Sequence, residues 1–228
     1  MVSPKISIVV PVYNMSNAVQ FLKRNLDSIV SQTFKDYEIV VSDDSDDDQL
    51  KIFCHKYQVR YVKNKGSKGM ANNTNHAIEN AKGKLIKILY QDDYFNTESS
   101  LEDINRYFVG YASWMVSGCA HSDGITQFND HFPFYSESEN TIGSPSVLTF
   151  KREVEERFDP EFHWVLDLDL YKRLYHNYGK PKILNKVNVV IGLHLGQKTY
   201  LLSDERKLLE YELLRRKYEQ HPSATAKL

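Results

Sequence analysis

The sequence lacks several features that mark particular classes of protein. Its 228 residues include only two cysteines, Cys54 and Cys119, so neither a disulfide framework nor a cysteine-based zinc site is expected. The apolar run Ile6–Val12 is far shorter than the roughly 20 residues that cross a bilayer. No basic region followed by an apolar run marks a signal peptide at the N-terminus. We therefore expect a cytoplasmic protein.

Net charge is also nearly absent. The chain has 29 Lys and Arg residues against 30 Asp and Glu residues, which gives a formal charge of −1. No overall basic field is present to attract nucleic acid, so we expect no nucleic-acid partner. The hydrophobic share of 41% is typical of a globular protein, and the length fits a single domain over residues 1–228.

Strand and helix patterns alternate through residues 1–95. Ile6–Val12 is a near-continuous apolar run, which is typical of a strand buried on both faces of a parallel sheet. Further strands are predicted over 37–41, 59–62 and 85–89. Helices are predicted over about 19–30, 48–57 and 71–81, with Ser16 or Asn17 as the N-cap of the first and Gly83 as the C-cap of the last.

This alternation predicts right-handed crossovers and an open, mostly parallel α/β sheet flanked by helices. Ligands bind such sheets beyond the carboxyl ends of the strands. Three predicted loops leave those ends, at 11–14, 43–48 and 91–93, and two of them are rich in carboxylates.

The remaining residues show a different pattern. Strands are predicted over 113–120, 147–150 and 183–193, and a helix over Leu166–Tyr178. The polar and aromatic stretch 121–146 is long for a connection, which is typical of a functional or mobile segment. A C-terminal helix is predicted within 201–220, followed by a disordered tail over 221–228.

Several acidic side chains are candidates for chemistry. Asp92 and Asp93 are adjacent at a predicted strand end, where a divalent cation would offset their repulsion; a solvated turn is the alternative. Asp43 directly follows a buried strand and could accept hydrogen bonds from a nucleobase or a ribose, whereas we interpret 44–48 as an acidic surface loop. Asp167 and Asp169 lie among aliphatic residues and are costly to bury without a partner. For Asp169 a simple role as a helix N-terminal carboxylate is equally acceptable.

Five motifs occur in a recognisable order. They are ISIVVPVYN at 6–14, LDSIVSQT at 26–33, EIVVSDDS at 38–45, an N-x-G…A-x-N…A-x-G…D-D pattern over 64–93, and LDLDLYKRL at 166–174. Together they resemble the family-2 glycosyltransferases with the GT-A fold, over most of the chain to about residue 200. The resemblance implies a nucleotide-sugar-binding half over 1–95 and an acceptor-binding half over 96–200.

The resemblance also assigns roles to residues. Pro11 and Tyr13 would lie in the donor loop, and Asp43 would contact the base. Asp93, with Asp92, would hold Mn²⁺ or Mg²⁺, although Asp92 is also a candidate for the ribose. Asp167 falls on the family's catalytic acid and would be the general base. Trp164 and His163 are candidates for acceptor contact.

The sequence departs from the family pattern at several positions. Tyr90 stands where the metal motif often has an acid, and Leu166 replaces the Glu that precedes the catalytic Asp. Asn72 stands where the family often has an Arg, and Lys68 could take over the contact that this Arg makes. His194 occupies the position of a late His or Arg near the diphosphate, and a purely structural role for it remains the alternative.

The reaction that the resemblance implies is inverting, metal-dependent sugar transfer from a nucleotide-diphosphate-sugar, with a UDP-sugar as the favoured donor. The acceptor would be a hydroxyl of a saccharide or lipid-linked saccharide in bacterial polysaccharide synthesis. Such an acceptor implies peripheral association with the inner face of the plasma membrane. Two alternatives stay open: a catalytically inactive nucleotide-sugar-binding module, and a nucleotidyltransferase on a related fold.

Overall fold

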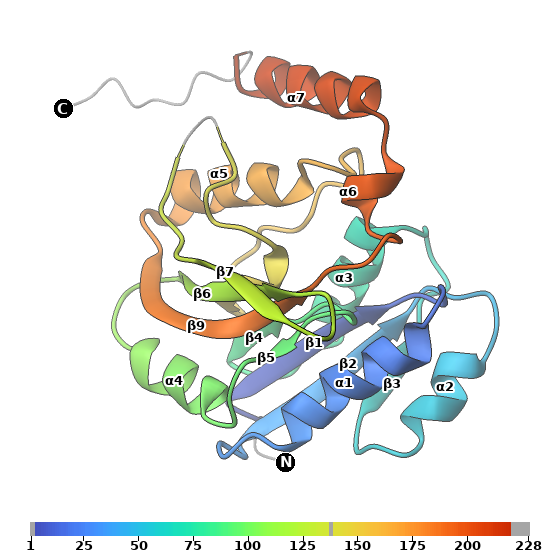
Figure 1. Ribbon diagram of the computed structural model, residues 1–228. Helices are drawn as coiled ribbons and strands as arrows, with labels where there is room; N and C mark the ends of the chain where they lie inside the picture. The colour runs from blue at the N-terminus through green and yellow to red at the C-terminus, as the bar shows by residue number, and fades with distance from the viewer. Residues whose placement is uncertain (1–2, 137–138, 220–228) are drawn as a thin grey trace.

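The computed structural model describes residues 3–136 and 139–219 and contains one sheet covered by helices (Figure 1). The predicted alternation of the first half is present, with bounds that differ from the predicted ones by a few residues. The strands are β1 (Ile6–Val12), β2 (Tyr37–Asp43), β3 (Arg60–Lys63) and β4 (Leu85–Ile88), and the helices are α1 (Ala18–Val30), α2 (Gln49–Cys54) and α3 (Met70–Glu79).

The second half adds strands on the far side of β4. The elements are β5 (Tyr94–Phe95), α4 (Ser100–Tyr107), β6 (Trp114–Ser122), β7 (Gln127–His131), the 3-10 turn η1 (Pro145–Val147), β8 (Leu148–Lys151), α5 (Leu166–Tyr178) and β9 (Lys182–Gly192). The long stretch 121–146 was not expected to contain a strand, but it includes β7.

The predicted C-terminal helix is interrupted. A short helix α6 (Lys198–Leu201) precedes α7 (Asp204–Glu219), because Leu202 is extended and Ser203 starts the next helix by accepting the Lys207 N–H on its carbonyl. Figure 1 shows α7 lying across α5 at the top of the molecule. The predicted tail over 221–228 lies outside the described residues. No helix in the described part of the chain is long and apolar enough to cross a membrane.

The sheet has the order β3-β2-β1-β4-β8-β6-β9-β5, with β7 paired to β6. β1 is parallel to β2 and β4, and β2 is parallel to β3, as the βαβ pattern predicts. β8 runs antiparallel to both β4 and β6, so the sheet is parallel in its first half and mixed beyond β4. The prediction of an open α/β sheet flanked by helices is confirmed.

The core positions the strand ends where ligands bind. All seven residues of β1 are buried, and α1 covers the sheet with Leu22, Leu26 and Ile29. Val12 pairs with Asp43 at the carboxyl ends of β1 and β2. The loops after β1, β2 and β4 therefore meet at one edge, as expected for a parallel sheet.

Of the two local predictions about caps, one is confirmed and one needs correction. Gly83 is not the C-cap of α3, which ends at Glu79 with Asn80 as the cap. Gly83 instead approaches β1 closely: its N–H donates to Ser7 Oγ at 2.7 Å, and a Cβ there would lie 2.5 Å from the Ser7 nitrogen. Asn17 does occupy the N-cap position of α1, but its side chain makes no capping hydrogen bond.

Candidate active site

The donor loop after β1 is tied to the acidic turn after β4. The Tyr13 N–H donates to Gln91 Oε1 at 2.7 Å, and Gln91 Nε2 donates back to the Tyr13 carbonyl at 3.1 Å. Pro11 lies within β1 and is buried, while the Tyr13 ring is 57% exposed and available to a ligand. Gln91, which lies between Tyr90 and the two aspartates, thus holds the backbone of the donor loop against the turn after β4.

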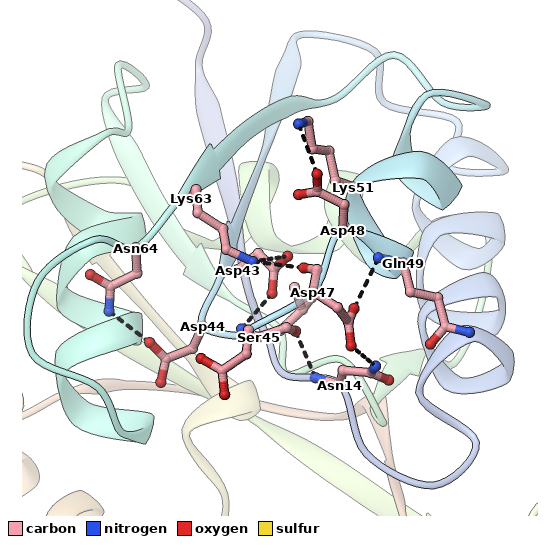
Figure 2. A network of polar contacts seen from close by, with 12 residues as sticks. Asn14, Asp43, Asp44, Ser45, Asp47, Asp48, Gln49, Lys51, Lys63 and Asn64 are labelled. Atoms are coloured by element: carbon pink, nitrogen blue, oxygen red, sulfur yellow. Dashed lines mark hydrogen bonds and ion pairs between the residues drawn. The ribbon is translucent and has the colours of Figure 1, made fainter.

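Asp43 lies fully buried at the end of β2 (Figure 2). Its Oδ1 accepts the Ser45 N–H at 2.8 Å. Its Oδ2 accepts from the Tyr61 hydroxyl at 2.6 Å and from Lys63 Nζ at 3.3 Å. Both oxygens of this carboxylate have internal partners, so a nucleotide that contacts it must share or displace one of them.

The loop after β2 is not simply an acidic surface. The expectation of an exposed position is wrong for Asp44, which is 6% exposed and accepts hydrogen bonds from Asn64 Nδ2 at 2.9 Å and the Gly69 N–H at 2.7 Å (Figure 2). Lys68 reaches the same loop, donating to the Asp44 carbonyl at 2.9 Å and pairing with Asp46. Asp44 therefore joins the loop after β2 to the loop before α3.

Asp92 and His194 form a partly exposed pair of potential metal ligands. His194 Nε2 lies 3.0 Å from Asp92 Oδ2, and the two side chains are 16% and 17% exposed. The Phe21 ring of α1 packs against the imidazole with the ring centroids 4.6 Å apart. The structure thus brings the late histidine, from the loop after β9, onto the acidic turn after β4.

A cavity of about 550 Å³ lies next to this pair. It is lined by residues of α1 and by 123–124 and 193–194, with His194 at its edge. Apart from His194, it includes none of the residues expected to bind the donor or to act as the base.

Asp93 differs from its neighbour because it is buried. Its Oδ1 accepts the Gly192 N–H at 3.0 Å, and the Ser146 hydroxyl also hydrogen bonds to it. Burial, and then the negative charge of Asp92, raise the pKa of the Asp93 carboxyl. Lys87 of β4 is also fully buried; burial lowers its pKa to about 7, against the attraction of Asp93. Asp93 is thus held inside the fold and is less available to a ligand than Asp92.

The backbone of the acidic turn is held from α1 and β9. Arg24 donates to the Asp92 carbonyl at 2.7 Å, and Asn25 Nδ2 donates to the Asp93 carbonyl at 2.9 Å. A Cβ at Gly192 would lie 2.2 Å from the Asp92 carbonyl oxygen, so the close approach of β9 requires glycine there. These contacts fix the turn that carries both acids.

Asp167 lies in the first turn of α5, and both oxygens of its carboxyl accept hydrogen bonds. Its Oδ1 accepts the Leu168 N–H at 2.8 Å, and its Oδ2 accepts from Asn140 Nδ2 at 2.7 Å. Desolvation is the largest influence on this partly enclosed carboxyl and raises its pKa to about 7, while the hydrogen bonds act in the opposite direction. A carboxyl with a pKa near neutrality is suited to accept a proton in catalysis.

Asp169 is not in surroundings like those of Asp167. It is fully buried, and its Oδ2 pairs with Arg173 at 2.6 Å while its Oδ1 pairs with Lys217 at 2.7 Å. The Tyr218 hydroxyl also donates to Asp169 Oδ1 at 3.0 Å. The interpretation of Asp169 as a simple helix N-terminal carboxylate is therefore incomplete, because this side chain joins α7 to α5.

Replacing Asp169 by Asn should destabilise the fold. The amide cannot neutralise Arg173 and Lys217, and breaking a buried ion pair costs about 3–5 kcal/mol. Urea unfolding at pH 7 measures the loss, and Asp204→Asn at the start of α7 is the control because the Asp204 side chain is 95% exposed and lies 3.4 Å from its partner Lys207. A loss below about 1 kcal/mol for Asp169→Asn would show that these ion pairs are not a stabilising link.

The two predicted acceptor residues lie where the loop before α5 meets α7. The His163 and Trp164 N–H groups both donate to Glu210 Oε2, at 2.9 and 2.6 Å. Lys207 Nζ lies 4.9 Å from the centroid of the Trp164 ring and occupies one of its faces. The His163 side chain is exposed, so it is the freer of the two to meet an acceptor.

Sequence reasoning did not find several residues that support the site. Lys87 carries a readable signal, because it is a lone charge inside the apolar run of β4. Arg24, Asn25 and Asn140 carry none, since nothing in their local sequence shows that they face Asp92, Asp93 and Asp167.

The comparisons with known proteins agree with this geometry. A family model described as glycosyl transferase family 2 matches residues 7–174, which is most of the chain. The chain belongs to this family. The resemblance that rested on five short motifs is thereby confirmed.

Two curated family-2 relatives illustrate the range of matches. The glycosyltransferase GlyA of Streptococcus pneumoniae is 25% identical over 215 residues, covering 90% of this chain and 29% of GlyA. The GalNAc(5)-diNAcBac-PP-undecaprenol beta-1,3-glucosyltransferase of Campylobacter jejuni is 34% identical over 115 residues, covering 48% of this chain and 36% of that enzyme. The chain therefore spans about a third of the length of these two relatives.

Solved structures show the same fold at low identity. S. aureus TarS 1-349 in complex with UDP-GlcNAc superposes with a TM-score of 0.72 at 20% identity, over 92% of this chain and 65% of that one. The mannosyltransferase PcManGT from Pyrobaculum calidifontis, in complex with GDP-Man and Mn²⁺, has a TM-score of 0.60 at 16% identity, over 88% of this chain and 59% of that one. The predicted GT-A-type glycosyltransferase fold is confirmed.

Proposed function

We propose that this chain catalyses inverting, metal-dependent transfer of a sugar from a nucleoside-diphosphate donor to an acceptor hydroxyl. The observation that carries the proposal is that Tyr90 lies electrostatically close to two chemically different groups. The accessible Asp92–His194 pair lies at the end of β4, and a carboxyl with its pKa near 7, Asp167, starts α5. Tyr90 lies within electrostatic reach of both Asp92 and Asp167.

A UDP-sugar is the donor that we favour. TarS has been solved with UDP and with UDP-GlcNAc, and an Escherichia coli relative 29% identical over 119 residues is a UDP-Glc-dependent glucosyltransferase. In this chain Tyr13 presents an exposed ring, Asp43 ends β2, and Lys68 carries a positive charge beside the same loop. These residues would hold the base, the ribose and the diphosphate.

The residues present fit a divalent cation. A carboxylate oxygen and an imidazole nitrogen are ligands that suit Mn²⁺, whereas Mg²⁺ prefers oxygen ligands alone. Within the described residues no group of three or more His, Cys, Asp or Glu side chains gathers around one point. Asp92 and His194 would therefore hold the ion together with the donor's phosphate oxygens, and the buried Asp93 would support Asp92. When bound, the ion would offset the charge that develops on the leaving diphosphate.

Asp167 would act on the acceptor. Asp167 would act as the carboxylate, and its Oδ2 would take the proton from the acceptor hydroxyl. The hydroxyl oxygen would attack the anomeric carbon as the bond between that carbon and the diphosphate breaks. General-base catalysis of this kind is typically worth 10²–10⁴-fold. Inversion requires the base and the leaving group to lie on opposite sides of the sugar. The base lies on α5, and the groups that would hold the diphosphate and its metal lie after β4. This separation supports that arrangement.

The acceptor is expected to be a saccharide or a lipid-linked saccharide. Two relatives are described as enzymes that act on undecaprenol-linked diphosphosugars. A lipid-linked acceptor would bring the protein to the cytoplasmic face of the plasma membrane as a peripheral partner. The exposed His163 and the half-buried Trp164 are the proposed contacts for the acceptor.

A nucleotide-binding panel tests the donor and the metal together. UDP, GDP, dTDP and CMP are each added with Mn²⁺ and with a chelator while thermal unfolding is followed. We expect UDP with Mn²⁺ to stabilise most, by about 2.7 kcal/mol at 100 times its dissociation constant. Equal stabilisation by UDP in the chelator would contradict the metal assignment, and stabilisation by none of the four nucleotides would contradict the donor site.

A further inference from the structure

The amide of Asn140 is held in one orientation against Asp167. Its Nδ2 donates to Asp167 Oδ2 at 2.7 Å and lies 3.3 Å from the Gly143 carbonyl oxygen. Its Oδ1 accepts the Ile142 N–H at 3.2 Å and the Gly143 N–H at 2.9 Å. Backbone N–H groups can only donate, so they identify the atom that faces them as the oxygen. The side of the amide that meets Asp167 is therefore a donor.

The segment 140–146 that carries Asn140 is anchored at both ends of the site. The Tyr171 hydroxyl of α5, one helical turn beyond Asp167, donates to the Gly143 carbonyl at 3.2 Å. At the other end, Ser146 Oγ accepts the Tyr90 N–H at 2.9 Å, beside the acidic turn after β4. Figure 1 shows the chain that precedes η1 running down beside α5. One segment thus spans from the base to the acidic turn.

The carboxylate of Asp167 keeps acceptor capacity for a substrate. Oδ1 accepts the Leu168 N–H, and Oδ2 accepts one bond, from Asn140. A carboxylate oxygen has two lone pairs, so Oδ2 can accept a second bond from the acceptor hydroxyl while it stays bonded to Asn140. The titratable groups electrostatically linked to Asp167 are Tyr90 at the end of β4 and Tyr171 of α5. Burial raises the pKa of both phenols, so both are neutral near pH 7.

We propose that Asn140 is the positioning residue of the general base: its side-chain N–H orients Asp167 and stabilises the carboxylate that accepts the proton. This inference rests on the proposed function, and it assigns to a loop residue a role that the family's sequence motif does not contain. In this chain Leu166 stands where the resemblance expects an acid, so the support for Asp167 comes from the 140–146 segment instead.

The electrostatic consequence follows from the direction of the bond. Desolvation favours the neutral acid and raises the pKa of Asp167 to about 7, while the donor bond from Asn140 favours the anion and opposes that shift. Removing the donor should therefore raise the pKa further.

Asn140→Asp tests this with little change in shape. The new carboxylate keeps an oxygen for the Ile142 and Gly143 N–H groups but turns a second oxygen toward Asp167, so attraction becomes repulsion. Asn140→Ala removes the donor without adding a second titrating carboxyl, which keeps the titration simple to assign. Asn177→Asp is the matched control, because Asn177 lies on the same helix as Asp167 and donates to Glu156 Oε1 at 2.5 Å, away from the site.

The direct readout is ¹³C NMR of aspartate labelled at the side-chain carboxyl, with the Asp167 signal assigned by its loss in Asp167→Asn. We expect a midpoint near pH 7 in the parent protein. It should rise by about one pH unit or more in Asn140→Asp, rise by less in Asn140→Ala, and stay unchanged in Asn177→Asp. Identical midpoints in the parent and both Asn140 variants would overturn the proposal.

The kinetic readout is release of UDP from UDP-GlcNAc with Mn²⁺. The acid limb of kcat/KM should move upward with the NMR midpoint, giving about a fivefold loss at pH 7 that is recovered above pH 9. A loss that is the same at every pH would overturn the proposal, because it would indicate damage to the loop. If Asp167→Asn itself retains full turnover, the proposed function fails, and the NMR midpoints still decide whether Asn140 controls the carboxyl.

Discussion

Asp167→Asn is expected to abolish sugar transfer while leaving the fold and donor binding intact. Asn is nearly isosteric with Asp and still accepts the Leu168 N–H on its oxygen, so the start of α5 should be preserved. The amide cannot accept a proton at neutral pH, so kcat should fall on the order of 10²-fold or more. Steady-state kinetics gives kcat, and calorimetric titration with UDP gives the donor affinity.

The control must share the helix position of Asp167 but not its chemistry. Asp204 lies in the first turn of α7 with its side chain 95% exposed, so Asp204→Asn removes a helix N-terminal charge that pairs with Lys207 and leaves the Asp167 carboxyl in place. Asp169→Asn is unsuitable because that residue holds two buried cations. If Asp167→Asn and Asp204→Asn turn over at the parent rate, the base lies elsewhere.

The pH dependence of kcat/KM in the parent enzyme tests the role of Asp167 independently of any substitution. A general base works as the carboxylate, so kcat/KM should rise with pH and level off above the pKa of about 7. Below that value it should fall about tenfold per pH unit, whereas an ordinary Asp would place this limb near pH 4.

Asp92→Ala is expected to remove the dependence of donor binding on metal. The substitution leaves His194 as a single exposed ligand, and one imidazole is too few to compete with water for a divalent cation. We expect UDP affinity in Mn²⁺ to fall to the level seen in the parent protein with a chelator. Calorimetric titration of UDP, with and without Mn²⁺, measures both values.

The matched controls separate the metal from general charge effects. Asp130→Ala removes an exposed carboxylate from β7 and should leave the metal dependence unchanged. His194→Ala should weaken the dependence in the same direction as Asp92→Ala, because the two side chains lie 3.0 Å apart. Full metal dependence in Asp92→Ala would return the assignment to Asp93.

The sequence predicted the parts of the molecule that depend on local patterns. The apolar runs of β1 and β4 identify buried strands, and the position of Asp43 and Asp92 at strand ends follows from parallel topology alone. α5 begins at Leu166 and ends at Tyr178 as its spacing predicts. These features need no knowledge of distant residues.

The rest depends on contacts between residues far apart in the chain. Gly83 resembles a helix cap in the sequence, yet its role comes from the approach of Ser7, 76 residues earlier. Asp169 resembles a helix N-terminal acid until Lys217, 48 residues later, is seen to pair with it. Asn140 sits in a polar stretch without periodicity, and only the fold shows that it meets Asp167. Sequence patterns therefore located the acids but not the groups that set their protonation.

The most direct test of the account is the identity of the first products formed from UDP-GlcNAc and Mn²⁺, with water or a saccharide as acceptor. Early ¹H NMR spectra should show the β-anomer from the α-linked donor together with UDP, in the parent protein and not in Asp167→Asn. Pyrophosphate in place of UDP would indicate nucleotidyl transfer, and an α-anomer as the first product would contradict attack opposite the leaving diphosphate. Binding of the donor with no product in any acceptor would favour an inactive binding module.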